Sequence, residues 1–393
     1  MNANALILLL LLPGLSAAAT LREALDAASA RAPLLRGLEA GREEAAAHRD
    51  AADRLFPGMP ALGLGQREGE GGKREFELEL ATPLWLPGQR QASLALADAR
   101  IEENSAAQAA RRWALAGELR NALATALAAR ADLDLARARL ENDKQLADEV
   151  ARRVAAGDLA RADLLLARGE ALASENAVLE ADSRLARALR DYRVLTGFSA
   201  LPTDAAETLA PPAADVLERH PALDSARHGV ELARAGLELA RRARRDAPEL
   251  GVQLQSARDT SGVDFRNSVR VGLRIPFSGE ARNRPLLAAA NGDLIRAEAE
   301  LARTLAELES ELTAAQAELA NAERARELAS ARRQGAAERL RLMRRGFDLG
   351  ELPLSQLLLA RGLANEAEAV ETRGGLLLAA ARARLNQARG VLP

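Results

Sequence analysis

Two long stretches without proline constrain this chain more than any other feature of its sequence. No proline occurs between Pro87 and Pro202, or between Pro285 and Pro353. Proline costs about 3 kcal/mol inside a helix, because it removes a hydrogen bond and clashes with the preceding turn. Each stretch can therefore form one very long helix. We expect helices over residues 88–155 and 281–348, each about 100 Å long at a rise of about 1.5 Å per residue.

Small and aliphatic residues follow a coiled-coil pattern along both predicted helices. Their spacing alternates between four and three residues, which places one apolar seam along a helix. In the first helix the seam comprises Leu115, Leu119, Ala122, Ala126, Ala129, Leu133, Ala136 and Leu140. In the second it comprises Leu308, Leu312, Ala315, Leu319 and Ala322. Small alanines in the seam allow neighbouring helices to approach closely.

The chain matches itself when it is displaced by 193 residues, which indicates an internal duplication. Gly157-Asp158-Leu159 aligns with Gly350-Glu351-Leu352, and residues 164–168 align with residues 357–361. After a signal peptide at 1–19, we expect a first repeat at 20–197, with helix 20–53, strand pair 55–86, long helix 88–155 and helix 159–196. A linker at 198–212 leads to a second repeat at 213–393, with helix 213–246, strand pair 248–277, long helix 281–348 and helix 352–390.

Composition excludes several classes of function. The chain has 393 residues, no Cys, three His and a net charge of −2. Without Cys we expect no disulfide, no thiolate chemistry and no acylated N-terminal Cys. The balanced charge gives no support for a nucleic-acid partner. His48, His220 and His228 are dispersed over different predicted helices, so we expect structural roles for them, no cofactor or metal site, and no enzyme.

The first residues indicate export. Ala5 to Leu15 is an apolar run, and Ala17-Ala18-Ala19 provides a cleavage pattern. The run is shorter than the roughly 20 residues that span a bilayer as a helix. We interpret residues 1–19 as a signal peptide, with the start of a buried helix as the alternative.

Four short segments break the helical pattern. Apolar and polar residues alternate with a period of two in Leu62–Gln66, Glu75–Leu80, Leu250–Gln255 and Val269–Ile275. This period places the apolar side chains of a strand on one face. Extended to about 10–13 residues, each segment could cross a bilayer as a tilted strand. The alternative is a pair of soluble hairpins packed against helices.

Membrane strands would require several copies of the chain. Open strand edges do not persist in lipid, and four strands are too few for a closed barrel, which needs at least about eight. Strand alternation would then direct five charged side chains into a water-filled lumen: Glu75, Glu77, Glu79, Arg270 and Arg274. Trp85, Phe76 and Phe277 would lie at the interfacial levels of the membrane.

Several short segments occur in a fixed order along the chain. Thr20-Leu21-Arg22-Glu23-Ala24-Leu25 opens the first helix, and Thr82–Arg90 leads from strand to long helix. A Gly-x-Leu segment followed by Leu-Leu-Leu-Ala-Arg occurs in each half, at 157–168 and 350–361, and the halves end at Leu195-Thr196-Gly197 and Ala388-Arg389-Gly390. Together with the duplicated order of strand pair and long helix, this set resembles the TolC family of outer-membrane efflux proteins over essentially the whole mature chain.

The resemblance implies a mainly α-helical fold with a small β part. Three copies would form a twelve-stranded barrel in the lipid of the outer membrane and an α-helical tunnel across the periplasm. Each chain would contribute four strands and two long antiparallel helical hairpins. The resemblance also implies that a periplasmic adaptor protein docks at the hairpin turns, here Gly157, Asp158, Leu159, Gly350, Glu351 and Leu352. Gly157 and Gly350 can adopt the positive φ that a tight reversal needs.

Two roles remain open for Asp158 and Glu351. They can favour the positive end of the helix that follows each turn, or form a ring of six carboxylates at the tunnel mouth of a trimer. The resemblance implies a passive efflux conduit that receives small substrates, metal cations or drugs, from an inner-membrane pump through the adaptor. Residues 83–90 and the compact strand loops look more like the heavy-metal branch. The alternative is a periplasmic coiled-coil adaptor or structural protein without a pore.

Overall fold

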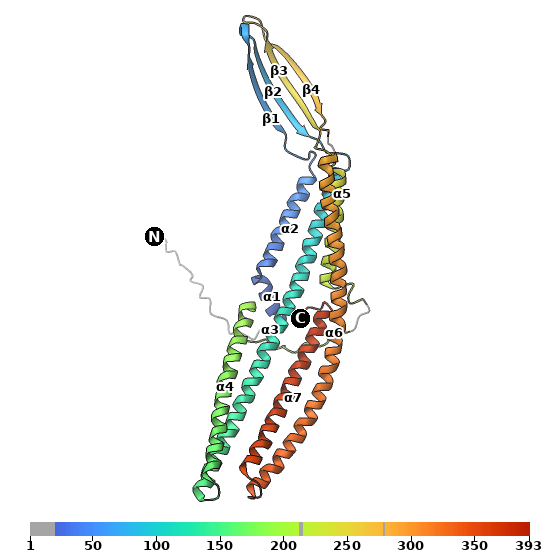
Figure 1. Ribbon diagram of the computed structural model, residues 1–393. Coiled ribbons are helices and arrows are strands. Elements are labelled where there is room, and N and C mark those ends of the chain that lie inside the picture. Colours follow the sequence, from blue (N-terminus) through green and yellow to red (C-terminus); the bar gives the residue numbers. More distant parts are fainter. Residues whose placement is uncertain (1–19, 212–214, 278–279) are drawn as a thin grey trace, which may run out of the picture. The chain divides into compact units, whose positions relative to one another are not determined.

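The computed structural model describes residues 20–211, 215–277 and 280–393, which divide into two compact units (Figure 1). The first unit contains the described residues up to Ala32, Ala114 to residue 211, and Glu311–Pro393; the second contains Pro33–Trp113 and residue 215 to Ser310. The signal peptide expected at 1–19, and residues 212–214 at the border of the expected linker, lie outside the described residues.

The longest elements are the two helices predicted from the absence of proline. Helix α3 covers Gln89–Ala156 and helix α6 covers Glu280–Asp348. The seam residues Leu115, Leu119 and Ala126 of α3, and Leu308 and Ala315 of α6, are buried. The return helices are α4, Arg161–Thr196, and α7, Leu354–Ala388. The proline-free stretches thus predicted the two long helices, and the coiled-coil pattern predicted the side that they bury.

Two shorter helices differ from the expected bounds, and proline is the reason in both cases. The helix expected at 20–53 is divided into α1, Leu21–Arg31, and α2, Pro33–Ala52. Ala32 between them is extended, with ψ at 115°, because a residue before proline avoids the helical region. The helix expected at 213–246 is shorter: α5 covers Pro221–Arg242.

The residue before Pro221 fixes the start of α5. His220 is extended, and its ring nitrogen Nδ1 accepts a hydrogen bond from the backbone N–H of Ala222 at 3.2 Å. The ring is fully buried and stacks edge-on against Trp113 at 4.6 Å. This N-cap is the structural role expected for His220.

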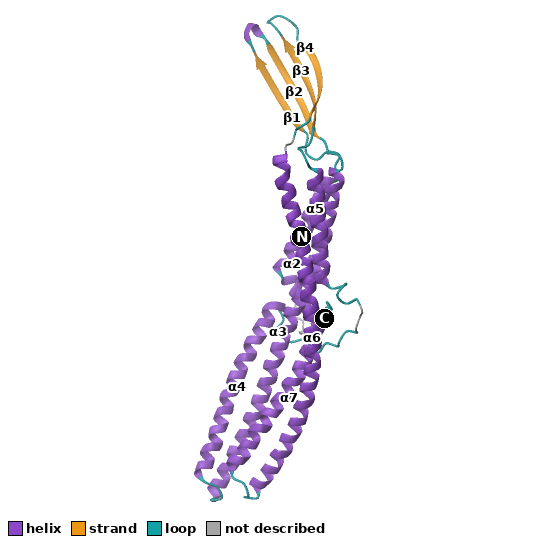
Figure 2. Ribbon diagram, turned by 45° about the vertical axis from the view of Figure 1, so that its right-hand side comes forward, coloured by secondary structure: helices purple, strands orange, loops and turns teal. Residues whose placement is uncertain are grey.

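The second unit carries a single four-stranded antiparallel sheet in the order β1-β2-β3-β4. The strands are β1, Ala61–Glu68; β2, Arg74–Pro83; β3, Glu249–Arg258; and β4, Arg266–Arg274. A short 3-10 turn, η1 (Glu70–Gly72), joins β1 to β2. The sheet lies beyond the ends of the helices of its unit, so no described helix covers either face (Figure 2).

The register separates the sheet into a polar and an apolar face. Residues directly opposite one another share a face, and Glu79 lies opposite both Gly63 and Gln253, which in turn lies opposite Arg270. The alternate positions form the apolar face, where Leu80, Val252 and Val271 stand in one row. The apolar face remains exposed, with Leu64 and Val271 at 79% and 68%.

In the first unit the helices form a row, with α3 and α7 in the middle and α4 and α6 at its edges (Figure 1). Ion pairs join the middle helices, Arg373 to Asp132 at 2.9 Å and Arg361 to Asp143 at 3.3 Å. Arg332 of α6 reaches Glu366 of α7 at 2.8 Å. On the other side, α4 packs against α3 through Ala188 and Ala126.

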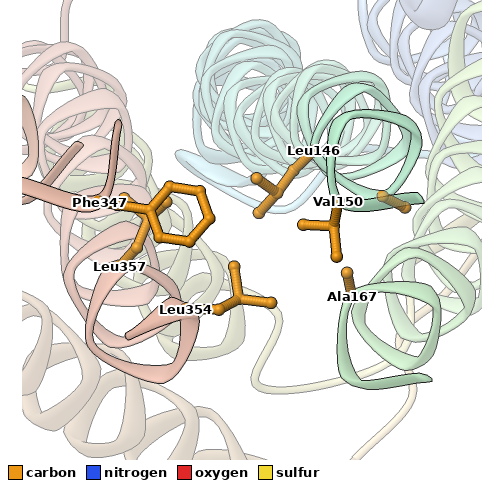
Figure 3. Packing of buried hydrophobic residues seen from close by; sticks show 7 residues of the cluster. Leu146, Val150, Ala167, Phe347, Leu354 and Leu357 are labelled. Carbon is orange, nitrogen blue, oxygen red and sulfur yellow. The ribbon is translucent and has the colours of Figure 1, made fainter. Parts of the chain in front are cut away.

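Near the turns the four helices share one apolar cluster (Figure 3). Its buried members are Leu146, Ala147, Val150, Ala167, Phe347, Leu354 and Leu357. They come from all four helices of the row, so the cluster holds the two hairpins together at their turns.

The segment after α4 is held by a buried ion pair. Arg120 of α3 binds both carboxylate oxygens of Glu207 at 2.7 Å, and both side chains are at most 10% exposed. Asn386 of α7 adds hydrogen bonds to Glu207 and to the backbone of Thr208 and Ala210. The residues expected to form a linker are thus packed on the helices as far as they are described, up to residue 211.

None of the described helices has an apolar stretch long enough to cross a lipid bilayer.

Replacement of Leu357 by Ala should lower the free energy of unfolding by about 2–5 kcal/mol. Leu357 is fully buried in the shared cluster, so truncation leaves a cavity. Leu359→Ala is the matched control, because Leu359 lies on the same helix and is 61% exposed. Urea denaturation followed by circular dichroism measures both. Equal loss of stability in the two variants would contradict the shared core.

Candidate functional site: the hairpin turns and the polar face of the sheet

The two hairpin turns have the same backbone structure. Gly157 and Gly350 have φ of 89° and 75°, the left-handed region that favours glycine. In the first turn the N–H of Gly157 donates to the carbonyl of Val154, and that of Asp158 to the carbonyl of Arg153. The second turn repeats both bonds at the equivalent positions of the other half, from the N–H groups of Gly350 and Glu351. These are the hydrogen bonds of a Schellman motif, which ends a helix and reverses the chain.

The turn carboxylates do not cap the helices that follow them. The sequence placed Asp158 at the start of the next helix, but α4 begins at Arg161, and its first turn uses a different acid. The carboxylate of Asp163 accepts from the backbone N–H of Ala160 at 3.2 Å. Asp158 and Glu351 are exposed, and their side chains form no hydrogen bond or ion pair with another described residue. Neither carboxylate forms a capping hydrogen bond, so both are available to a partner or to ions, and their effect on the positive helix ends stays a prediction.

The leucines of the turns pack inwards. Leu159 lies against the apolar cluster of the four helices. Leu352 covers Gly346, where an added Cβ atom would lie only 2.7 Å from the Leu352 side chain. The turns thus present a backbone and two carboxylates outwards, on a rigid apolar base.

An ion network connects the two long helices just before their turns. Arg153 of α3 contacts Asp348 of α6 at 3.2 Å, and its guanidinium lies 4.8 Å from the centre of the Phe347 ring. Arg344 of α6 binds Glu149 of α3 and Asp348 of its own helix. Two acids and two arginines therefore alternate across the helix pair, which fixes the two turns relative to each other.

A second network is buried further from the turns. The carboxylate of Asp143 is 6% exposed; it accepts a hydrogen bond from the Ser174 hydroxyl at 2.6 Å and pairs with Arg361 at 3.3 Å. Burial lowers the pKa of the Arg361 guanidinium, and the charge of Asp143 acts in the opposite direction. This pair connects α3, α4 and α7.

The polar face of the sheet carries charge in separate columns. Glu75, Glu77 and Glu79 stand at alternate positions of β2, and Arg266, Arg270 and Arg274 lie on the same face of β4. Glutamines of β3 stand between the columns: Gln255 binds Glu75, and Gln253 accepts from Arg270 at 3.3 Å. On β1, Gly63 and Gly65 lie beside Glu79 and Glu77, so no β1 side chain covers these carboxylates.

The structure brings together each predicted group of site residues. The five charged strand residues share one face, and the six turn residues form two equivalent turns, one group in each unit. Sequence reasoning missed Gln253, Gln255 and Arg266 on the polar face, although their alternation in the sequence could have indicated them. It also missed the network of Glu149, Arg153, Arg344 and Asp348. Among the described residues, no three His, Asp or Glu side chains are arranged to hold a metal ion.

The fold is that of known outer-membrane channels. The structure of CusC has 18% sequence identity to this chain and a TM-score of 0.79, over 95% of this chain and 92% of CusC. VceC of Vibrio cholerae has 16% identity and a TM-score of 0.77, over 94% and 96% of the two chains. The open state of MtrE of Neisseria gonorrhoeae has 18% identity and a TM-score of 0.76, over 94% and 89%. No curated protein sequence matches the chain.

A mainly helical chain with a small four-stranded antiparallel sheet thus has the TolC-like fold of these structures. Residues 24–197 match the family model of outer membrane efflux proteins. The first half of the chain is thus similar to outer membrane efflux proteins in sequence, and the fold similarity to the solved structures extends over both halves.

Replacement of Asp143 by Asn should lower the free energy of unfolding by about 3–5 kcal/mol, because it leaves the buried charge of Arg361 unpaired. Glu170→Gln is the control. Glu170 is 41% exposed and pairs with Arg139 at 3.4 Å, so its loss should change stability by less than about 1 kcal/mol. Urea denaturation of the two variants compares these values. A small effect of Asp143→Asn would show that Arg361 finds another partner.

Proposed function

We propose that this chain is the outer-membrane channel of a tripartite efflux system. Three copies form a continuous conduit across the outer membrane and periplasm, and small substrates pass from an inner-membrane pump through a periplasmic adaptor. The observation that supports this proposal most directly is the four-stranded sheet. One of its faces is apolar and exposed, the other is charged, and no described helix covers either face. A sheet of this kind needs lipid on one side and water on the other.

The sheet edges support the trimer. Within the described chain, β1 pairs only with β2, and β4 only with β3, so each outer strand has an unpaired edge. Unpaired backbone groups cost several kcal/mol each in lipid. Pairing β4 of one copy with β1 of the next satisfies both edges, and three copies close a barrel of twelve strands.

Aromatic side chains near both ends of the sheet support its insertion in lipid. Phe76 and Phe265 lie near the strand loops, with ring centres 5.9 Å apart. Trp85 and Phe277 follow β2 and β4 at the other end, and Phe277 is 98% exposed. Aromatic girdles at both interfaces are typical of membrane barrels.

The hairpin turns support an adaptor contact at the periplasmic end. Both turns have rigid bases and matching backbones, so a trimer presents six similar turns. Gly157, Asp158, Leu159, Gly350, Glu351 and Leu352 would form the contact surface. Metal cations and drugs remain the two substrate classes, and a passive conduit needs no storage site for either.

The alternative function is a periplasmic coiled-coil adaptor or structural protein without a pore. The long hairpins alone would fit it, but the exposed apolar face of the sheet would then lack a partner. Trimers that conduct ions in planar bilayers, as single channels, support the conduit. A soluble monomer in the periplasmic fraction would overturn it.

The charge columns should determine the ion selectivity of the barrel. We expect replacement of Glu75, Glu77 and Glu79 by Gln to shift permeability towards anions, and Arg270→Gln with Arg274→Gln to shift it towards cations. Reversal potentials in a KCl gradient measure both shifts. Glu68→Gln is the control, because Glu68 lies on the opposite face of the sheet. Unchanged selectivity in both variants would place these residues outside the lumen.

Charge reversal at the turns, Asp158→Arg with Glu351→Arg, should abolish export in cells while trimers remain in the outer membrane. Both side chains are exposed and lack partners in the described chain, so the fold should persist. Asp134→Arg, an exposed acid on α3, controls for the charge change. Normal export would exclude the turns as the adaptor contact. A selectivity shift in the isolated channel would additionally support a carboxylate ring at the tunnel mouth.

A further inference from the structure

Four arginines follow one another closely in the sequence where the helices of the second unit meet the sheet. They lie in Arg241–Arg245, at the end of helix α5 and in the segment that leads to β3. The backbone N–H of Leu84, just after β2, donates to the carbonyl of Pro248 at 2.7 Å. Asn283 of α6 donates to the backbone carbonyl of Arg244. These two bonds hold the segment at the end of the sheet where β2 ends and β3 begins (Figure 1).

The negative end of helix α5 explains only some of these charges. Cations in the last turn of a helix favour its C-terminus, and Arg241 and Arg242 lie in the last turn of α5. Both also contact the carboxylate of Glu238, at 3.9 Å and 2.7 Å. Arg244 lies beyond the helix, and its Nε donates to the carbonyl of Arg241 at 2.9 Å. The side chain of Arg245 forms no hydrogen bond or ion pair with another described residue.

Three of these arginines line a cavity that also has apolar walls. The cavity has a volume of about 480 Å³, and its lining includes Arg242, Arg244 and Arg245 together with Leu86 and Phe277. Phe277 is 98% exposed. Among the described residues no acidic side chain lines the cavity. The cavity therefore combines several positive charges with an uncovered aromatic ring.

Charge is distributed unequally between the two ends of the sheet. Four segments connect the helices to the strands or adjoin these connections: 53–60, 84–90, 241–248 and 275–284. Their sequences contain eight arginines and three acids. The loops at the opposite end of the sheet, 69–73 and 259–265, contain one lysine and three acids. Since the whole chain has a net charge of −2, the positive charge at the helix end of the sheet is a local feature.

The apolar residues of β4 continue as far as the cavity. Val269, Val271, Leu273, Ile275 and Phe277 alternate with other residues along the chain, and they are 42–98% exposed. The first three belong to the apolar face of the sheet, and the last lines the cavity. Under the proposed function the apolar face contacts hydrocarbon. The polar headgroups of a bilayer begin where its hydrocarbon ends, so the arginines lie at the level of the headgroups.

A phospholipid phosphate has the chemistry that this cavity can recognise. A guanidinium group can donate two parallel N–H bonds to phosphate oxygens, and it is more weakly hydrated than an ammonium group. Cations next to a membrane span attract anionic lipids, by about fivefold in affinity for each Arg. Zwitterionic lipids carry a cationic group as well, which would meet arginines and no acid within the described lining of the cavity. The cavity therefore favours a lipid with net negative charge.

We infer that this cavity binds the phosphate group of an anionic phospholipid at the membrane surface next to the helices. Arg244 and Arg245 hold the phosphate, and Phe277 contacts the acyl chains. The inference rests on the proposed function, because it requires the sheet to lie in lipid. It goes further in assigning the class of lipid and the residues that bind it. Free phosphate would share the arginines but would leave Phe277 uncovered, so the structure favours the lipid.

Competition between two lipids tests the site. The purified full chain in detergent is mixed with equal amounts of phosphatidylglycerol and phosphatidylcholine, and native mass spectrometry measures which lipid stays bound. The unaltered protein should prefer phosphatidylglycerol. Replacement of Arg244 and Arg245 by Gln should reduce this preference by about 25-fold, and Arg245→Gln alone by about fivefold. Because Arg245 has no partner in the described chain, the single variant should keep the fold.

The matched control is Arg42→Gln with Arg100→Gln. Both arginines are exposed on helices of the same unit, about 15 Å along the helix from the ends next to the sheet. This variant loses the same charge and should keep the lipid preference. Equal preference in the control and in the variant of Arg244 and Arg245 would overturn the inference.

Inorganic phosphate distinguishes a lipid from a free anion as the ligand. Sodium phosphate should not displace phosphatidylglycerol more than sodium chloride of the same ionic strength, because the acyl chains add contacts that phosphate lacks. Phe277→Ser should weaken the retention of phosphatidylglycerol for the same reason. Selective displacement by phosphate, with unchanged retention in Phe277→Ser, would assign the site to a free anion and overturn the lipid.

Conduction in planar bilayers of phosphatidylcholine separates this inference from the proposed function. A protein that conducts there as single channels, but shows no preference for phosphatidylglycerol in detergent, would overturn the inference and leave the channel proposal intact. A protein that neither inserts into bilayers nor retains phosphatidylglycerol would overturn both.

Discussion

The structure depends on the close approach of long helices through small side chains. Helices α4 and α7 bury an alanine, serine or glycine every seven residues: Ala167, Ser174, Ala181 and Ala188 on α4, and Ala360, Ala367, Gly374, Ala381 and Ala388 on α7. At Gly374 an added Cβ would already touch Ala329 of α6, at 4.0 Å. Small seams bring helix axes together over many turns, but each residue buries little apolar surface. The hairpins must therefore obtain further stability elsewhere.

Two kinds of interaction supply this further stability of the hairpins. Near the turns, Phe347, Leu354 and Leu357 concentrate the larger apolar side chains in one cluster. Further along, the buried pair of Asp143 with Arg361 joins α3 to α7, and the buried pair of Arg120 with Glu207 joins α3 to the segment after α4. A buried ion pair adds little net stability but strongly disfavours misaligned packing, because a slip would leave a charge unpaired. In a chain of repetitive heptads, such pairs can fix the register.

A single copy of the chain also leaves surfaces without a packing or hydrogen-bonding partner. In the part of the chain that the structure describes, the sheet has two unpaired edges and an exposed apolar face. Lipid can cover the apolar face, and a second copy can pair with the strand edges. A ring of copies satisfies all of these surfaces together, with charge retained on the inner face of the sheet. The proposed conduit follows from this requirement.

The sequence by itself determined the long helices, the turn glycines and the alternation of the strands. Proline gaps, heptads and period-two patterns are local signals, and each acts within one element, as the positive φ of Gly157 and Gly350 illustrates. Local signals also misled where a single residue overrode them: Pro33 divided one expected helix, and Pro221 shortened another. The internal duplication stays a prediction from the sequence.

Only the tertiary structure decided which distant residues meet. The register between strands decided which residues stand opposite one another, with Gln253 between Glu79 and Arg270, and pairing is a non-local choice that alternation cannot fix. Helix packing likewise determined which side of α4 is buried. Ala181 is buried, whereas Leu179, two residues before it, remains exposed. Hydrophobicity alone would predict the reverse. The reason is geometric: close helix packing selects small side chains, whatever their transfer free energy.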